Sequence, residues 1–552
     1  MVKQLLKYMK TKWVIVVLVL CVALFLRIYK IDSNPPGLTP DEAALGYNAY
    51  SILKTGKDEY GTKLPIVFKS FGDYKPGLYV YLAVPAVATL GLNETAVRLP
   101  SVIAGVINVF LVYLITKELF RKDKLSLISL VVAATNPWLI YFSRGAWEVN
   151  VALTLTLAGI YFFLRSFEKN KVIILPGIFF ALTLLDYQGA KLSTTVVLVI
   201  LFILYWRELL KIKLKYSIMA FMIGLIITLP IILGLFNGQI GRLNVFSIFS
   251  YPRGNELQTF LNEGNIKKGS IVYDLFYNEP LNFFRGITGR FFNYFSGRFL
   301  FFEGDWANPR HTPPYQGVLV VGDIMFLAIG IVIFLKERIS KEKLFVLLWL
   351  ILAPLPAILS RDQVQAVRSF QLSIPLIIII SFGINEFVTT RAKKIFIVLV
   401  FAIYALTYAY FLDSYFVHQP IHNSKLWQYG YKQMVEKIIP IQKNYNKIFV
   451  QQSYDQPYIY FLFYEKYNPA SWQKQANLRI NSSGDVGLVE HLDNICFCKI
   501  DWSIDRGDHG DLVVGDINAI PPVDSVDPKE FIVIDEINYL NNLPAWRMIE
   551  VK

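Results

Sequence analysis

Long apolar stretches recur along the first three quarters of the chain, and short polar or basic stretches separate them. An α-helix needs roughly 20 mostly apolar residues to cross a bilayer, although shorter spans occur. The pattern therefore predicts a polytopic α-helical membrane protein. We expect about eleven transmembrane helices, near residues 13–30, 98–120, 125–143, 149–166, 172–187, 191–206, 217–236, 316–335, 344–359, 371–388 and 395–412.

The last quarter of the chain has a different pattern. Short apolar runs there are bounded by turn-forming residues, as in the strands of a soluble domain. The predicted strands lie at residues 447–450, 511–514 and 531–534. A helix is predicted at 457–464. We therefore expect a membrane domain over residues 1–412 and a small α/β domain over residues 413–552.

Composition supports this division. Of the 552 residues, 54% are hydrophobic and only 18% are charged, and the mean hydropathy is +0.42, which is too apolar for a soluble protein of this size. Residues 413–552 carry 13 Lys and Arg residues against 18 Asp and Glu residues, although the whole chain has a net charge of +13. The basic excess therefore belongs to the membrane domain, where it indicates orientation and not nucleic-acid binding.

The basic stretches predict the orientation. They alternate with polar loops and fall on the same side as the lysine-rich N-terminus, which the positive-inside rule assigns to the cytoplasm. The first apolar stretch lacks a small-residue cleavage site, so we expect it to be an uncleaved anchor. An odd number of spans then places loops 31–97 and 237–315 and the α/β domain outside the plasma membrane.

Two adjacent carboxylates, Asp41 and Glu42, follow the first span. Thr39, Pro40 and Glu42 match the start of a helix, because Thr39 suits the N-cap and Glu42 is correctly spaced for a capping box. The capping box alone accounts for the presence of a glutamate at position 42. It leaves Asp41 available to a site at the membrane surface, and we expect the helix that follows to lie in the interface and to end before Gly56.

Other ionisable residues are predicted at the same outer surface. Lys75 lies between Asp73 and a second apolar stretch that Pro85 interrupts, so it either binds a phosphate or is an ordinary interfacial lysine. Arg144 and Glu148 flank a tight turn, where they form a salt bridge or line a cavity. Further candidates lie on two other outer loops: Arg310, His311, Arg361 and Arg368.

These motifs occur in a recognisable order. They are Pro-Gly-Leu-Thr-Pro-Asp41-Glu42, Lys75-Pro-Gly-Leu, Arg98-Leu-Pro-Ser, Ser143-Arg144, Pro309-Arg310-His311 and Arg368. The chain resembles bacterial polyprenyl-phosphate-dependent glycosyltransferases of the C-type fold, the superfamily of protein O-mannosyltransferases and aminoarabinose transferases. The resemblance covers about residues 10–412.

The resemblance implies that the protein transfers a sugar from a polyprenyl-phosphate donor with inversion, with Asp41 as the general base. The acceptor is expected to be extracytoplasmic, and a protein, a lipid and a cell-wall glycan all stay open as its class. Candidate catalytic residues are Asp41, Glu42 and Glu148. Candidate donor-phosphate residues are Lys75, Arg310 and Arg368. Candidate cavity residues are Asp73, Arg144 and His311.

The chain departs from the family pattern at one motif, and the resemblance does not decide whether a metal ion is bound. Aminoarabinose transferases carry Lys-Pro-Pro after an acidic residue, whereas here Tyr74 precedes Lys75 and Gly77 replaces the second proline. A divalent metal therefore stays an alternative without assigned ligands.

Two other functions compete with sugar transfer. One is a transporter or flippase of lipid-linked glycans, but its usual internal repeat and midplane polar groups are not visible in the sequence. The other is a surface assembly protein in which the carboxylates only cap helices. That protein would function normally with Asp41→Asn.

Overall fold

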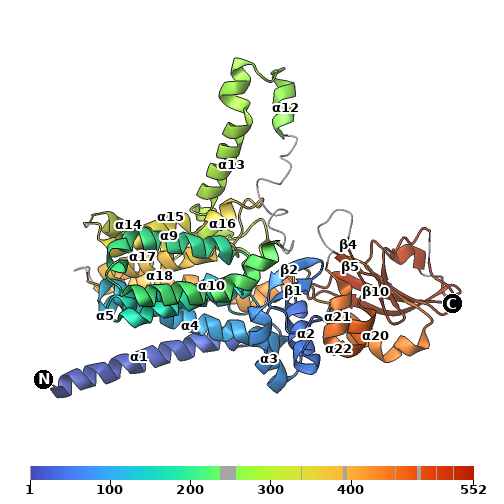
Figure 1. Ribbon diagram of the computed structural model, residues 1–552. Helices are drawn as coiled ribbons and strands as arrows, with labels where there is room; N and C mark the ends of the chain where they lie inside the picture. Colours follow the sequence, from blue (N-terminus) through green and yellow to red (C-terminus); the bar gives the residue numbers. More distant parts are fainter. Residues whose placement is uncertain are drawn as a thin grey trace.

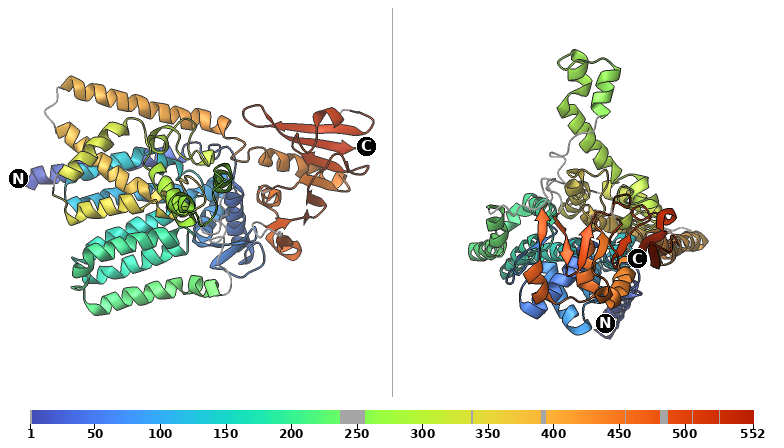
Figure 2. Two further views of the ribbon diagram at one scale, coloured as in Figure 1. Left: turned by 90° about the horizontal axis from the view of Figure 1, so that it is seen from above. Right: turned by 90° about the vertical axis from the view of Figure 1, so that its right-hand side faces the viewer.

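The computed structural model shows a bundle of long helices with a smaller sheet domain at one end (Figure 1). The described residues are 2–236, 256–336, 338–389, 394–453, 455–480, 487–504, 506–525 and 527–552. The start of the expected outer loop 237–315 and most of the basic stretch 391–394 lie outside them. The N-terminus and the C-terminal domain project from opposite ends of the bundle, as the two views of Figure 2 also show.

Each of the eleven expected ranges contains a helix of the bundle. These helices are α1 (Val2–Ile28), α4 (Glu94–Phe120), α5 (Asp123–Thr135), α7 (Glu148–Ser166), α8 (Ile174–Leu184), α9 (Ala190–Leu209), α10 (Leu214–Phe236), α14 (Asp323–Lys336), α15 (Lys341–Leu352), α17 (Ser373–Thr389) and α18 (Lys394–Asp413). Among the described residues, seven helices are long and apolar enough to cross a membrane by length and composition. The fold class is confirmed, and the number of spans stays a prediction.

Two expected spans are each divided into two helices at a proline, and a third starts later than expected. The range 125–143 divides at Asn136-Pro137 into α5 and the short α6 (Pro137–Tyr141). The range 344–359 divides before Pro354 into α15 and α16 (Leu355–Ile358). Proline lacks the N–H that a continuing helix needs and disfavours helical geometry at the preceding residue. The third span, expected from residue 316, starts only at Asp323.

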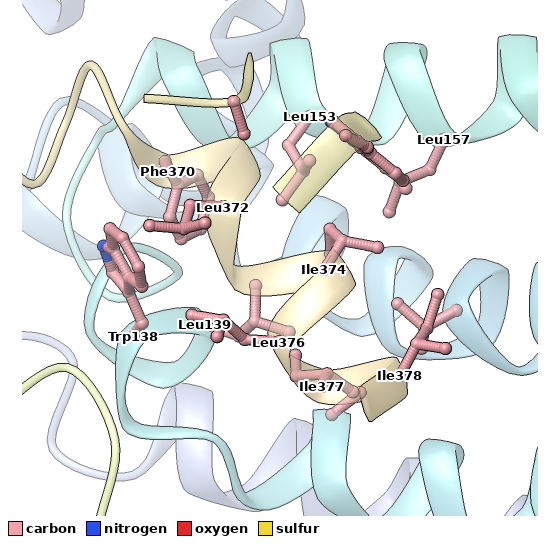
Figure 3. Packing of buried hydrophobic residues seen from close by; sticks show 14 of the residues in the cluster. Trp138, Leu139, Leu153, Leu157, Phe370, Leu372, Ile374, Leu376, Ile377 and Ile378 are labelled. Carbon is pink, nitrogen blue, oxygen red and sulfur yellow. The ribbon is translucent and has the colours of Figure 1, made fainter. Parts of the chain in front are cut away.

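Helix α17 lies at the centre of the bundle. Its run Ile377 to Ile380 is fully buried, which is typical of a helix that other helices surround on every side. Leu153 and Leu157 of α7 and Trp138 of α6 pack around its N-terminal half (Figure 3). The core therefore fixes α6 and the N-terminal part of α7 against the start of α17.

The first outer loop folds into two helices and a hairpin. Helix α2 (Pro40–Thr55) begins with the expected capping box and ends at Gly56, whose φ of 67° suits glycine. The hairpin strands are β1 (Val67–Ser70) and β2 (Asp73–Pro76). The second expected interfacial helix is α3 (Leu78–Leu90), with Pro85 inside it.

The C-terminal domain contains a six-stranded mixed sheet in the order β6-β7-β3-β8-β10-β9. Strand β3 runs parallel to its neighbours β7 and β8, and the outer strands are antiparallel. The strands of the domain are β3 (Ile448–Gln451), β4 (Leu478–Ile480), β5 (Gly487–Val489), β6 (His491–Leu492), β7 (Ile495–Cys498), β8 (Leu512–Gly515), β9 (Phe531–Asn538) and β10 (Pro544–Val551). Its helices are α20 (Tyr431–Ile438), α21 (Pro457–Tyr464) and α22 (Pro469–Gln475), and α19 (Gln419–His422) precedes them.

Helix α21 fixes this domain to the first outer loop. The Tyr460 hydroxyl donates a hydrogen bond to the Leu38 carbonyl at 3.2 Å, and the Tyr47 hydroxyl of α2 donates to the Tyr467 carbonyl at 3.1 Å. Side chains of α2, α3 and α21 share one apolar core. The outer loop and the domain are therefore packed as one unit.

Buried Glu59 makes this contact sensitive to pH. It accepts hydrogen bonds from Asn48 at 3.0 Å and Tyr458 at 3.4 Å, and burial raises the pKa of its carboxyl to about 8. The unfolded carboxyl titrates near its ordinary value of 4.5. The folded state thus holds the proton more tightly, and the stability from this group is present below about pH 4.5 and is lost as the pH rises through about 8.

We expect Glu59→Gln to reduce this loss of stability. Between these pH values, a single carboxyl changes the free energy of unfolding by at most about 1.4 kcal/mol per pH unit. Thermal unfolding in detergent at pH 5, 7 and 9 should show a smaller decline in midpoint for Glu59→Gln than for the wild type. The exposed Glu436→Gln serves as the control, and equal declines in all three proteins would contradict the assignment.

Candidate active site

The start of α2 directs its two carboxylates to different environments. The Thr39 hydroxyl accepts a hydrogen bond from the Glu42 N–H at 3.2 Å, and the Glu42 carboxylate accepts one from the Thr39 N–H at 3.0 Å. Glu42 also accepts from the Ala146 N–H at 2.8 Å and is 4% exposed. By contrast, 60% of the Asp41 side chain is exposed. Glu42 therefore has a structural role in the start of α2, whereas the Asp41 side chain lies at the protein surface.

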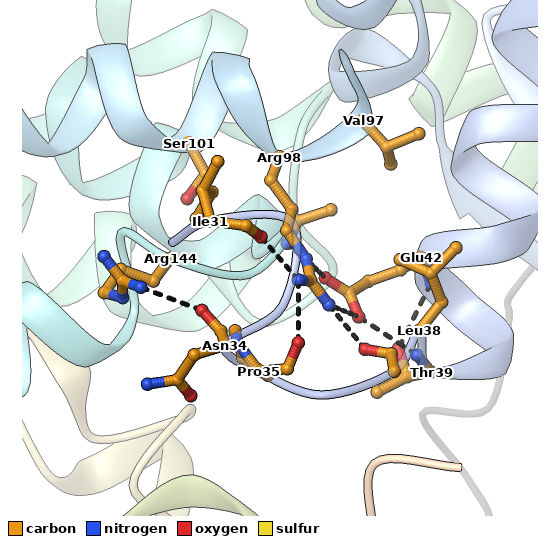
Figure 4. A network of polar contacts seen from close by, with 12 residues as sticks. Ile31, Asn34, Pro35, Leu38, Thr39, Glu42, Val97, Arg98, Ser101 and Arg144 are labelled. Carbon is orange, nitrogen blue, oxygen red and sulfur yellow. Dashed lines mark hydrogen bonds and ion pairs between the residues drawn. The ribbon is translucent and has the colours of Figure 1, made fainter. Parts of the chain in front are cut away.

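Arg98 is the buried partner of Glu42 (Figure 4). Its Nε lies 3.1 Å from a Glu42 carboxylate oxygen, and the guanidinium also donates to the carbonyls of Ile31 at 2.8 Å and Pro35 at 3.0 Å, and to that of Gly37. Several charge-assisted hydrogen bonds thus compensate for the burial of both charges. They hold the chain between α1 and α2 against α4.

Arg144 supports the same segment from the other side. Its guanidinium donates to the carbonyls of Leu26 at 3.0 Å and Asn34 at 2.9 Å, and to the Tyr415 hydroxyl at 2.9 Å. Figure 4 shows it directed at Asn34. We expected Arg144 either to form a salt bridge with Glu148 or to line a cavity, and these contacts favour neither alternative. They give this buried arginine a structural role.

Asp41 forms an ion pair with Lys75 of β2. The two side chains line a small pocket with Asn48, Ser70 and Val80. Burial lowers the pKa of Lys75, but the nearby carboxylates of Asp41, Glu148 and Asp73 raise it, so that it lies above its ordinary value. Lys75 is therefore a cation at neutral pH that several carboxylates surround.

The hairpin explains why glycine follows Lys75-Pro76. A Cβ atom at Gly77 would lie 2.2 Å from the Phe68 ring and 3.0 Å from the Ile66 carbonyl, both on the facing side of the hairpin. Any side chain at this position would push the strands apart. The departure from Lys-Pro-Pro therefore accompanies close packing that holds Lys75 beside Asp41.

The loop between α8 and α9 also borders Lys75, and the sequence analysis did not identify it. Gln188 donates to the Tyr74 carbonyl at 2.6 Å and accepts a hydrogen bond from Lys191 at 2.7 Å. Burial raises the pKa of Tyr187 to about 12, against a lowering effect of Arg368 and with a further increase from Glu148. Tyr187 therefore keeps its hydroxyl proton at neutral pH.

Asp186, in the same loop, is fully buried, and neither carboxylate oxygen has a protein hydrogen-bond partner. Burial and the neighbouring Glu148 raise its pKa well above the ordinary value. Only the polar sequence Asp186-Tyr187-Gln188 between two apolar stretches could have indicated this loop beforehand.

Arg368 lies near this loop. Its guanidinium contacts Asp362 at 3.1 Å, and its charge acts on the hydroxyl of Tyr187. Since Tyr187 also lies in the field of Glu148, the structure brings Arg368, Tyr187 and Glu148 to one region next to Lys75.

Arg310 and His311 have different neighbours. The His311 Nδ1 lies 2.8 Å from an Asp305 carboxylate oxygen, which also accepts the Ala366 N–H at 2.8 Å. Burial lowers the pKa of His311 despite this carboxylate, so the ring is neutral at neutral pH. The charge of Arg310 acts on Asp455 of the C-terminal domain. These contacts favour a structural role for His311 in the packed core. They place Arg310 near the C-terminal domain.

The residues that the structure describes contain no group of three or more His, Cys, Asp or Glu side chains arranged to hold a metal ion. One structure of the Archaeoglobus fulgidus oligosaccharyltransferase is a complex with Zn and sulfate. The residues around Asp41 do not provide such a ligand set, so we assign none of them to a metal.

Comparison with known proteins gives one family match. Residues 75–233 match the family described as dolichyl-phosphate-mannose-protein mannosyltransferase. This segment contains Lys75, Glu148 and the α8–α9 loop. No curated protein matches the sequence at a significant level.

Solved structures match over more of the chain. ArnT from Cupriavidus metallidurans bound to undecaprenyl phosphate is 12% identical, with 98% of each chain covered and a TM-score of 0.55. Its apo form is 13% identical, with the same coverage and a TM-score of 0.53. The archaeal oligosaccharyltransferase AglB from Archaeoglobus fulgidus, in complex with an inhibitory peptide and a dolichol-phosphate, is 13% identical, with a TM-score of 0.48. That match covers 82% of this chain, which spans 63% of the length of AglB.

The resemblance predicted from the sequence is confirmed. The chain has the fold of the ArnT structures and the helices of a multi-pass membrane protein. Together with the family match, this fold supports a membrane glycosyltransferase that uses a lipid-linked sugar donor.

The different environments of Asp41 and Glu42 predict different effects on stability. Glu42→Gln leaves the buried Arg98 without its anion, and breaking a buried pair costs about 3–5 kcal/mol. Asp41→Asn removes an exposed pair with Lys75, which contributes about 0–1 kcal/mol. Thermal unfolding in detergent should therefore show a clearly lower midpoint for Glu42→Gln and little change for Asp41→Asn. Equal midpoints would contradict the structural role of Glu42.

Proposed function

We propose that this protein is a membrane glycosyltransferase that moves a sugar from a polyprenyl-phosphate donor to an extracytoplasmic acceptor, with Asp41 as the general base. The observation that carries the proposal is the contrast within the acidic pair. Glu42 is buried in the fold, whereas Asp41 is exposed, paired with Lys75 and placed at the end of the bundle that bears the C-terminal domain.

The reaction follows from this position. Asp41 removes the proton of an acceptor hydroxyl or amine as the acceptor atom forms a bond to the anomeric carbon. The bond from that carbon to the phosphate oxygen breaks, and polyprenyl phosphate leaves with the bonding electron pair. A single displacement of this kind inverts the anomeric centre.

Lys75 and Arg368 are the proposed partners of the donor phosphate. An ammonium or guanidinium stabilises the negative charge that develops on the leaving oxygen. Lys75 is already paired with Asp41, so a phosphate that attracts Lys75 weakens the ion pair between Lys75 and the Asp41 carboxylate. Donor binding and release of Asp41 are coupled in this way.

Two candidates have supporting roles in the proposal. Glu148 lies in the field of Lys75 and stabilises that cation. The charge of Arg310 acts on Asp455 of the C-terminal domain, and the proposal assigns Arg310 to the acceptor side. The proposed domains are 1–412 for donor binding and chemistry and 413–552 for the cover.

The orientation belongs to the same proposal. Basic stretches support a cytoplasmic N-terminus in the plasma membrane, and the C-terminal domain at the opposite end of the bundle is then extracytoplasmic. The ArnT structure that is bound to undecaprenyl phosphate supports a polyprenyl-phosphate donor.

Asp41→Asn tests the base. Loss of general-base catalysis lowers the rate about 10²- to 10⁴-fold. The assay supplies radiolabelled polyprenyl-phosphate sugars to the protein in nanodiscs, with a membrane extract as acceptor. We expect transfer by the wild type and a drop of this size in Asp41→Asn, and Asp41→Glu should retain more activity because it keeps the carboxylate. Full transfer by Asp41→Asn would assign Asp41 to helix capping, and no transfer by the wild type with any donor would favour a transporter.

Lys75→Met tests the phosphate partner. We expect a higher KM for the donor and a lower kcat, because the lost charge acts on both the bound and the leaving phosphate. Lys69→Met is the matched control, since Lys69 lies on the partner strand of the same hairpin and stacks over Tyr60. Initial rates against donor concentration separate the two constants. Unchanged constants in Lys75→Met would contradict the assignment.

A further inference from the structure

A helical hairpin stands away from the bundle on the outer side. It comprises α12 (Glu256–Glu263), a helical turn at Tyr273–Tyr277 and α13 (Glu279–Asn293). Figure 1 shows it running across the direction of the spans, near the end that bears the C-terminal domain, and both views of Figure 2 agree. An element with this direction lies parallel to the membrane surface.

Helix α13 is amphipathic. Apolar residues recur every three or four positions at Leu281, Phe284, Thr288 and Phe291, where threonine contributes its methyl group. A separate polar stripe follows the same spacing on the other side of the helix: Glu279, Asn282, Gly286, Arg290 and Asn293. A helix with one apolar and one polar face suits a boundary between two media.

Part of the apolar face is uncovered by protein, although Ile287 and Phe291 pack against the core of the bundle. Phe284 is 66% exposed and Phe292 is 63% exposed. At the other end of the hairpin, Ile271, Leu275 and Phe276 are 76%, 60% and 55% exposed. In water, so large an apolar surface would be unfavourable.

Among the described residues, the base of the hairpin is held by hydrogen bonds to another loop. Arg290 donates to the Arg361 carbonyl at 3.4 Å, and Asn293 donates to the Gln363 carbonyl at 3.3 Å. The contacted loop carries Asp362, the partner of Arg368. The base is thus joined to the region of the candidate site, and the rest of the hairpin extends sideways.

We propose that this hairpin lies in the outer leaflet of the bilayer, with Phe284 and Phe292 of α13 and the exposed Leu275 and Phe276 of the turn directed towards the acyl chains. Three observations favour lipid over a protein partner. The hairpin runs along the membrane plane, its apolar face adds to the lipid-facing surface of the bundle, and Lys267 and Lys268 stand exposed beside the turn, where phosphate headgroups are. The hairpin therefore places lipid next to the loop that positions Arg368.

Nitroxide accessibility in nanodiscs tests the proposal on the full chain. Cys21, Cys496 and Cys498 are first replaced by Ala, and single labels are attached at Phe276→Cys and Phe284→Cys. Asn282→Cys is the matched control on the polar face of the same helix. Phe221→Cys on α10, 69% exposed, is the lipid reference, and Val523→Cys in the C-terminal domain, 81% exposed, is the water reference.

We expect labels at 276 and 284 to collide more often with oxygen than with a water-soluble nickel complex, as at 221. The label at 282 should show the opposite preference, as at 523. Preference for nickel at 276 and 284 would place the hairpin in water, and protection from both reagents would show that protein covers it. Either result would overturn the proposal. Phe276 and Phe284 are exposed and Asn282 is half-buried, and size-exclusion profiles confirm folding of each variant.

Discussion

The buried ion pair between Arg98 and Glu42 determines how the outer surface is built. Arg98 extends from the start of α4 and gathers three carbonyls of the chain between α1 and α2, in addition to the Glu42 carboxylate. Such a pair is costly to desolvate, and it persists because almost every donor and acceptor finds a partner. It sets where α2 begins, and the start of α2 in turn determines which way Asp41 points. The position of the proposed base is therefore a consequence of a structural contact one residue away.

The C-terminal domain contributes to the same arrangement from the other side. A Cβ atom at Gly37 would lie 2.2 Å from the Trp427 carbonyl, and the Tyr460 hydroxyl binds the Leu38 carbonyl. The segment that Arg98 holds is thus clamped between the bundle and the domain. Because these contacts involve backbone groups, they require close approach and specific backbone positions more than particular side chains. A domain without recognisable chemistry of its own can still be necessary for the geometry of the site.

Much of the fold could be predicted because each span carries its own signal. The length of the apolar stretches predicted the positions of the bundle helices. Thr39, Pro40 and Glu42 predicted the start of α2 and the different environments of the two carboxylates. The β1–β2 hairpin and the Asp186-Tyr187-Gln188 loop have no such local signal, since they reach the site only through packing between distant segments. The structural role of Arg144 was equally hidden. The sequence looks the same whether a buried arginine binds backbone carbonyls or a ligand, and only the contacts in the structure distinguish the two roles.

Lys75 is the described cation on which three carboxylates of the site act together. Asp41, Asp73 and Glu148 all act on that one ammonium, while Arg368 is shared with Asp362. Burial raises the pKa of Asp186 well above its ordinary value, so this carboxyl resists ionisation more than an exposed aspartate does. A phosphate group that enters such a site has to compete for cations that carboxylates already engage. Since the contact of Lys75 is with Asp41, that competition acts first on the proposed base, and in the proposed reaction the ion pair that holds Asp41 is also the contact through which a donor acts on it.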